Sequence, residues 1–112
     1  MYLYRIKPDG SAFGRWQLGD APLIVGRDEG VAVWIPDYRM SGRHFAIVRE
    51  GDTFVLHDLN SKNGTWVNGT RITGLELKPN DRITAGRTEF FFEAEETRRR
   101  EEQEAGTNQL VA

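Results

Sequence analysis

The dipeptide Asn68-Gly69, set between two short apolar runs, constrains the fold of this chain more than any other feature of the sequence. Asn-Gly favours a type I′ turn, in which both central residues need positive φ and which joins two antiparallel strands. We therefore expect a β-hairpin made of Trp66-Val67 and Arg71-Ile72. The run 53–58 is rich in β-branched and aromatic residues and predicts a further strand shortly before the hairpin.

Short runs of this kind recur along the first 93 residues, and Gly, Pro, Asn or Asp residues separate them. The expected strands cover 2–6, 13–18, 23–25, 31–35, 45–48, 53–58, 66–67, 71–72, 75–77, 82–85 and 89–93. No stretch of residues 1–93 has the period of an amphipathic helix. The sequence predicts an all-β fold, a β-sandwich of about ten to eleven short, mostly antiparallel strands.

Residues 94–112 differ in character from the rest of the chain. They are rich in Glu and Arg, contain favourable i,i+4 pairs and have no apolar face. We therefore expect one domain over residues 1–93, followed by a charged tail or linker over 94–112. A helix that binds a partner is the alternative for this tail.

The charge balance argues against a nucleic-acid partner. In residues 1–93, three Lys and nine Arg balance twelve Asp or Glu, so the net charge of −2 arises in the tail. No basic excess of the kind found in duplex-binding proteins is visible. The chain has no cysteine, signal peptide or long apolar segment, so we expect a soluble cytoplasmic protein without disulfides, metal or cofactor, which does not bind membranes. Its oligomeric state is left open.

Three polar loops, each adjoining the end of an expected strand, carry the candidate functional residues. They contain Arg27 in the first loop, Arg39, Ser41, Gly42, Arg43 and His44 in the second, and Ser61, Lys62 and Asn63 in the third. Loops cluster at the ends of a sandwich, and such a cluster would combine cations, hydroxyls and an amide. That chemistry suits a phosphate group. The alternative is that these residues only form turns.

The pattern Gly26-Arg27, Ser41-x-x-His44 and Asn63-Gly64-Thr65-x-x-Asn68-Gly69 resembles the forkhead-associated (FHA) domain. This family folds as an eleven-strand β-sandwich and binds phosphothreonine peptides. The resemblance covers residues 1 to about 93, and the three blocks follow the order and spacing of the family. It implies a phosphothreonine-dependent recognition module for signalling assembly, whose partner is a phosphothreonine-containing protein or peptide.

The resemblance also implies a role for each matching residue. Arg27 would pair with the phosphate, and Ser41 would donate to it from both its hydroxyl and its backbone N–H. Asn63 would hold the main chain of the peptide, because an amide both donates and accepts. His44 would brace the loops without touching the phosphate. The remaining matches are expected to have structural roles: Gly26, Gly64, Asn68 and Gly69.

The sequence departs from the family at Gly42, where many members carry a side chain that reaches the phosphate. Lys62 or Arg43 would then supply the missing cation, and Lys62 is preferred because it directly precedes Asn63 on a facing loop. Arg39, two residues before Ser41, is expected to favour an acidic residue about three positions after the phosphothreonine. The alternative is that Arg39 is solvated or paired with Asp37.

Two other functions compete with phosphothreonine recognition. An enzyme would use Ser41 as nucleophile, His44 as base and Asp58 as orienting group, but Ser-x-x-His is a common coincidence. The chain lacks a nucleophile elbow, a Walker loop and a credible metal set, so we do not expect an enzyme. The stronger alternative is an interaction domain of the same fold that binds its partner independently of phosphate.

Overall fold

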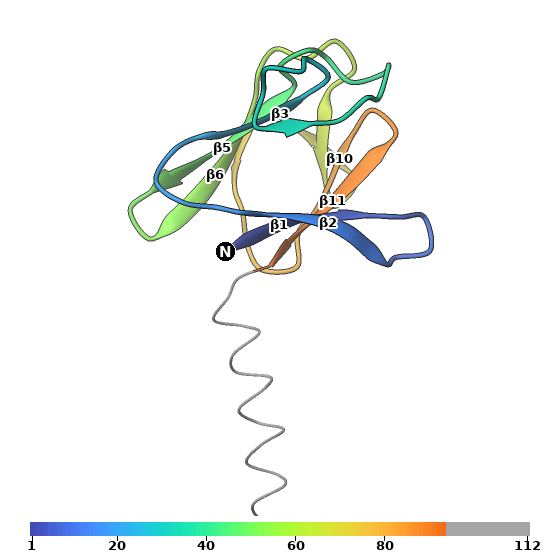
Figure 1. Ribbon diagram of the computed structural model, residues 1–112. Coiled ribbons are helices and arrows are strands. Elements are labelled where there is room, and N and C mark those ends of the chain that lie inside the picture. Colours follow the sequence, from blue (N-terminus) through green and yellow to red (C-terminus); the bar gives the residue numbers. More distant parts are fainter. Residues whose placement is uncertain (94–112) are drawn as a thin grey trace, which may run out of the picture.

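The computed structural model describes residues 1–93, which form two packed β-sheets (Figure 1). The strands are β1 (Tyr2–Ile6), β2 (Ala12–Gln17), β3 (Leu23–Gly26), β4 (Val33–Trp34), β5 (Phe45–Glu50), β6 (Thr53–Asp58), β7 (Thr65–Val67), β8 (Thr70–Ile72), β9 (Gly74–Glu76), β10 (Arg82–Ala85) and β11 (Thr88–Glu93). The expected all-β sandwich is confirmed. Among the described residues, no helix is long and apolar enough to span a membrane. The charged tail or linker expected over 94–112, and its alternative of a partner-binding helix, lie outside the described residues.

One sheet has six strands in the order β2-β1-β11-β10-β7-β8, and the other has five in the order β4-β3-β5-β6-β9. Within residues 1–93, strands pair in antiparallel fashion except β3 and β4, which run parallel with Val25 opposite Val33. The expectation of a strand over 31–35 was too long. The Val31 N–H closes a turn on the Asp28 carbonyl, and Pro36 follows with no N–H to donate, so only Val33 and Trp34 are in strand conformation.

The hairpin predicted from Asn68-Gly69 is present between β7 and β8. Asn68 has φ 50° and Gly69 has φ 83°, as a type I′ turn needs, and Val67 pairs with Thr70. The Asn68 side chain also holds the turn to the start of β10. Its Nδ2 donates to Asp81 at 2.9 Å, and its Oδ1 accepts from the Arg82 N–H at 3.0 Å. Asn68 therefore has a structural role in both its backbone and its side chain.

Two aromatic pairs join the sheets through the core. Phe45 of β5 meets Phe90 of β11 edge to face, with ring centroids 5.5 Å apart, and Phe54 of β6 meets Phe92 of β11 at 6.1 Å. The β11 side chains alternate, so that Phe90 and Phe92 face inward with Thr88. Such edge-to-face contacts add to the energy of burial and keep the sheets in register. The loops at one end of the sandwich therefore extend from a rigid base (Figure 1).

Candidate functional site

Ser41 joins the three candidate loops. Its carbonyl accepts the Arg27 N–H at 3.0 Å, which ties the loop after β3 to the loop before β5. Its Oγ accepts the Lys62 N–H at 3.0 Å, which adds the loop between β6 and β7. The expected clustering of the loops is therefore correct. Because the Ser41 oxygen already accepts from a backbone donor, its own O–H is left to donate elsewhere.

His44 is fully buried beneath Ser41 and braces two loops. Its Nδ1 accepts the Ser41 N–H at 2.9 Å, and its Nε2 lies 2.8 Å from the Gly64 carbonyl. A backbone N–H can only donate, so Nδ1 is unprotonated, and the proton must lie on Nε2 to donate to the carbonyl. The ring is held as one neutral tautomer, in the structural role expected for His44.

This contact corrects one expectation for the site and bears on one rejected alternative. The Ser41 N–H, expected to bind ligand, is already bonded to His44, so its hydroxyl is the remaining donor. The ring nitrogens of His44 bond to main-chain groups, and neither bonds to the Ser41 hydroxyl or to the Asp58 carboxylate. The alternative Ser-His-Asp arrangement is therefore not formed.

Asp58 at the end of β6 shapes the loop that carries Asn63. Its carboxylate accepts the Ser61 hydroxyl, the Ser61 N–H at 3.1 Å and the Thr65 hydroxyl at 2.7 Å. Burial alone would raise the pKa of Asp58, but the hydrogen bonds from Ser61 and Thr65 outweigh it, so the net pKa lies below 3.8. Ser61 was expected to offer its hydroxyl to a ligand. It is instead buried, and its hydroxyl donates to the Asp58 carboxylate.

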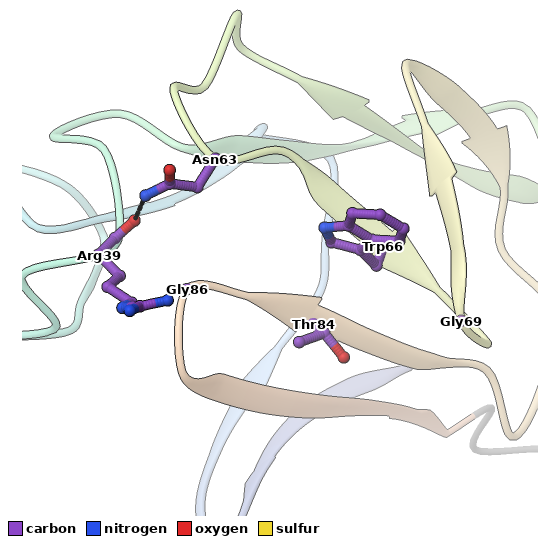
Figure 2. A pocket seen from close by; sticks show the side chains of 6 residues that line it. All are labelled: Arg39, Asn63, Trp66, Gly69, Thr84 and Gly86. Carbon is purple, nitrogen blue, oxygen red and sulfur yellow. Dashed lines mark hydrogen bonds between the residues drawn. The ribbon is translucent and has the colours of Figure 1, made fainter.

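Asn63 and Arg39 meet at the rim of the site. The Asn63 Nδ2 donates to the Arg39 carbonyl at 2.8 Å, as Figure 2 shows, which leaves Oδ1 and one N–H for a ligand. Asp37 does accept an Arg39 hydrogen bond, but from its backbone N–H at 2.9 Å. Within residues 1–93 the Arg39 guanidinium makes no ion pair, so the alternative pairing with Asp37 is wrong.

Asp37 has a structural role that sequence reasoning missed. Its Oδ2 accepts the Arg87 N–H at 2.7 Å and the Thr88 hydroxyl at 2.8 Å, so it ties the Ser41 loop to the turn between β10 and β11. Burial alone would raise the pKa of Asp37, but hydrogen bonds from Arg39, Thr88 and Arg87 lower it below 3.8. The signal in the sequence was an Asp that directly follows Pro36 at the start of the loop.

The structural glycines of the site serve two different purposes. Gly64 has φ 88° and Gly69 has φ 83°, a backbone conformation that only glycine adopts easily. Gly26 is needed for another reason, because a Cβ there would lie 2.0 Å from the Gly42 carbonyl oxygen. The absence of a side chain at Gly26 lets the loops after β3 and before β5 approach each other closely.

The Asp28 carboxylate lies next to Gly42, where the sequence departs from the family. A Cβ on Gly42 would lie 2.6 Å from each oxygen of the Asp28 carboxylate, so Asp28 occupies the space that a side chain at this position would need. The Asp28 N–H also donates to the Gly42 carbonyl at 3.1 Å. No local pattern predicts this contact, because it depends on how the two loops approach each other. The site thus has a carboxylate next to Gly42.

The three loops that Ser41 joins carry four exposed cationic residues: Arg27, Arg39, Arg43 and Lys62. None of them forms an ion pair with another described residue. The Arg27 Nη1 lies 3.4 Å from the Tyr38 carbonyl, a long hydrogen bond, and the Trp34 indole donates to the Arg27 carbonyl at 2.9 Å. Sequence reasoning missed Trp34 and Tyr38, which hold Arg27 beside the loop. The arrangement offers four cations and one hydroxyl to an oxyanion.

A protein-family model for the FHA domain matches residues 23–86. This span includes all three loops and more than half of the chain. The chain belongs to the FHA family. The resemblance noted from the sequence is thereby confirmed, and with it the identity of this eleven-strand fold as an FHA sandwich.

Two curated relatives support the assignment. The FHA domain-containing protein FhaA of Mycobacterium tuberculosis is 39% identical to this FHA domain over 74% of the chain. The oxoglutarate dehydrogenase inhibitor of Corynebacterium jeikeium is 29% identical over 78% of it. The matched part is 16% of FhaA and 60% of the inhibitor, so the chain spans less than two thirds of either relative.

Solved FHA structures share the fold. One, from a study of phosphothreonine-dependent FHA domain interactions, superposes with a TM-score of 0.75 at 31% identity and covers 83% of this chain and 94% of its own. The FhaA FHA domain in complex with the intracellular domain of Rv3910 has a TM-score of 0.72 at 32% identity, covering 80% of this chain and 96% of its own.

Proposed function

We propose that this FHA domain recognises proteins that carry a phosphothreonine and holds the phosphate at Ser41. The observation that carries the proposal is that Ser41 joins three loops which bear four cationic residues without ion pairs among residues 1–93, together with its own hydroxyl donor. A phosphate dianion would satisfy several of these groups at once through charge-assisted hydrogen bonds. The phosphothreonine-dependent interactions studied in a structural neighbour support the same assignment.

Each side chain has a defined part in this proposal. Arg27 pairs with the phosphate, and the Ser41 hydroxyl donates to it. Lys62 supplies the further cation in preference to Arg43, because its backbone N–H already bonds to Ser41 Oγ and its side chain therefore starts beside the site. Asn63 uses its free Oδ1 and N–H to hold the main chain of the peptide.

The proposed function is recognition in the cytoplasm rather than catalysis. FHA relatives such as the oxoglutarate dehydrogenase inhibitor support a regulatory interaction role, and the neutral charge balance of residues 1–93 supports a protein partner over nucleic acid. The proposed partner is one phosphorylated protein segment, with no membrane contact.

An oriented library of phosphothreonine peptides identifies a binding sequence, and calorimetry then compares the best peptide with its unphosphorylated form. We expect binding only to the phosphorylated form. Arg27→Ala should cost about 2 to 5 kcal/mol of binding free energy, the range for removing one partner of a desolvated charge pair. The fold should remain, because Arg27 is exposed.

Arg49→Ala is the matched control, because Arg49 is also exposed but pairs with Asp20. Its affinity should equal that of the parent protein. Equal binding of the two peptides would favour the phosphate-independent interaction domain. A folded Arg27→Ala variant with the affinity of the parent would exclude Arg27 as a phosphate ligand.

A further inference from the structure

A groove of about 470 Å³ opens directly beside the proposed phosphate site, on the outer face of the six-stranded sheet (Figure 2). Its lining residues are Arg39, Asn63, Trp66, Gly69, Thr84 and Gly86. The groove follows β7 and β10, whose residues Trp66 and Thr84 lie opposite each other. It begins at Asn63 and Arg39 and ends at the turn that holds Gly69.

The strand periodicity places Trp66 on the solvent side. Thr65 and Val67 point into the core, so the side chain between them points outward, and 38% of Trp66 is exposed. Thr84 faces the same way between the buried Ile83 and Ala85. An exposed indole on a sheet face contributes nothing to the core, and such a side chain is frequent at binding surfaces.

Positive charges outnumber negative ones around the groove, where Glu89 lies opposite Thr84 on the neighbouring strand β11. The groove lining within residues 1–93 includes Arg39 and no carboxylate. Arg71 of β8 lies opposite Trp66 and therefore on the same face, and its guanidinium packs against the backbone at Gly64. The indole and these cations together suit a segment with an apolar side chain and acidic neighbours.

We propose that the groove binds the part of the phosphorylated ligand that lies beyond the third residue after the phosphothreonine. This inference rests on the proposed function, because Asn63 and Arg39 line both the groove and the peptide site. A ligand that is held by Asn63 and continues past Arg39 enters the groove and stays on the outer face of the six-stranded sheet. An extended peptide advances about 3.3 Å per residue, so four further residues extend about 13 Å along the groove.

Fluorescence anisotropy with synthetic phosphothreonine peptides tests the inference. A short peptide ends at the third residue after the phosphothreonine, and a second continues for four residues as Glu-Phe-Glu-Leu. A third peptide continues for four residues as Gly-Ser-Gly-Ser instead. A fourth carries Glu-Phe-Glu-Leu at the N-terminal end of the short peptide. We expect the C-terminal Glu-Phe-Glu-Leu peptide alone to bind about five- to tenfold more tightly than the short peptide.

Trp66→Ala should abolish this gain and leave the affinity for the short peptide unchanged. Phe13→Ala is the control, because Phe13 is also an exposed aromatic residue, 47% against 38% for Trp66, and lies on β2, away from the groove. It should keep the gain. Thr84→Tyr fills the groove from its floor and should also abolish the gain, which keeps the test valid if Trp66→Ala does not fold.

Equal affinities of all the phosphorylated peptides would overturn the inference and leave the proposed function intact. A gain from Gly-Ser-Gly-Ser or from the N-terminal extension would also overturn it. If removal of residues 94–112 tightens binding of the long peptide, the tail occupies the groove and the inference is overturned. If Trp66→Ala dissociates a dimer seen by sedimentation, a second copy occupies it, with the same consequence. If no phosphothreonine peptide binds, the proposed function fails and the inference falls with it.

Discussion

His44 satisfies two backbone groups that belong to different loops, the Ser41 N–H and the Gly64 carbonyl. A single side chain thereby fixes the position of Ser41 relative to the loop that carries Asn63. The resemblance to the FHA domain implied a bracing role for this histidine, and the packing shows which two main-chain groups its ring bonds.

We expect His44→Ala to lower both stability and binding. Each buried group left without its partner costs about 1 to 3 kcal/mol of the free energy of unfolding. Urea denaturation measures this loss. His57→Ala is the control, because His57 is exposed and its Nε2 makes only a long approach of 3.8 Å to the Glu50 carboxylate. Equal unfolding free energies for the two variants would contradict a bracing role for His44.

Arg39 remains the predicted determinant of peptide selectivity, because its guanidinium is exposed and makes no ion pair within residues 1–93. We expect a preference for Asp or Glu about three residues after the phosphothreonine. An exposed pair is worth about 0.2 to 1 kcal/mol, so the preference should be a few-fold and should weaken in high salt.

The oriented phosphopeptide library measures this preference directly. Arg39→Ala should remove the acidic preference at that position, whereas Arg49→Ala should keep it. An enrichment that is unchanged in Arg39→Ala would assign the selectivity to another residue.

At the scale of elements, the site depends on how closely the end of β3 approaches the loop before β5. Gly26 ends β3, and its missing side chain makes room for the Gly42 carbonyl. Two backbone hydrogen bonds, from Arg27 to Ser41 and from Asp28 to Gly42, then hold the segments side by side. Arg27 and Ser41 are brought together by the backbone, before any ligand binds.

We expect Gly26→Ala to destabilise the protein by about 1 to 3 kcal/mol, the usual cost of overpacking, and to weaken phosphopeptide binding. Its Cβ would meet backbone, which cannot move aside as a flexible side chain can. Gly30→Ala in the next turn is the control, because its Cβ would meet nothing within 4 Å. Thermal unfolding and calorimetry on both variants check this. Similar effects of the two substitutions would show that the close approach is not essential.

At the scale of the whole molecule, the two sheets form a scaffold that places its binding loops at one end and the end of β11 away from them (Figure 1). The hydrophobic core of the described part runs from Leu3 to Phe92. The boundary at residue 93 remains a prediction, which rests on the change in composition that follows it.

Removal of residues 94–112 should therefore leave the melting temperature and the affinity for a short phosphothreonine peptide unchanged. The reason is that this polar tail has no apolar face to add to a core. Calorimetric melts and anisotropy titrations of the full chain and the 1–93 variant make the comparison. A marked fall in melting temperature would extend the domain into the tail.

Local sequence was sufficient to predict the strands, the Asn68-Gly69 turn and the loops that hold Arg27, Ser41 and Asn63. Alternation of side chains and the need for positive φ act over a few residues, so they are readable without tertiary structure. The strand predicted over 31–35 was too long. The Val31 N–H closes a turn on the Asp28 carbonyl, and the alternation of side chains does not predict such a hydrogen bond.

Tertiary structure alone decided which polar groups remain available to a ligand. The Ser41 N–H is taken by His44, the Ser61 hydroxyl by Asp58, and the space beside Gly42 by Asp28. The groove at Trp66 likewise exists because β7 pairs with β10, so that Trp66 lies opposite Thr84, eighteen residues further along the chain. Such contacts depend on the register and approach of segments distant in sequence, and no local pattern specifies those distances.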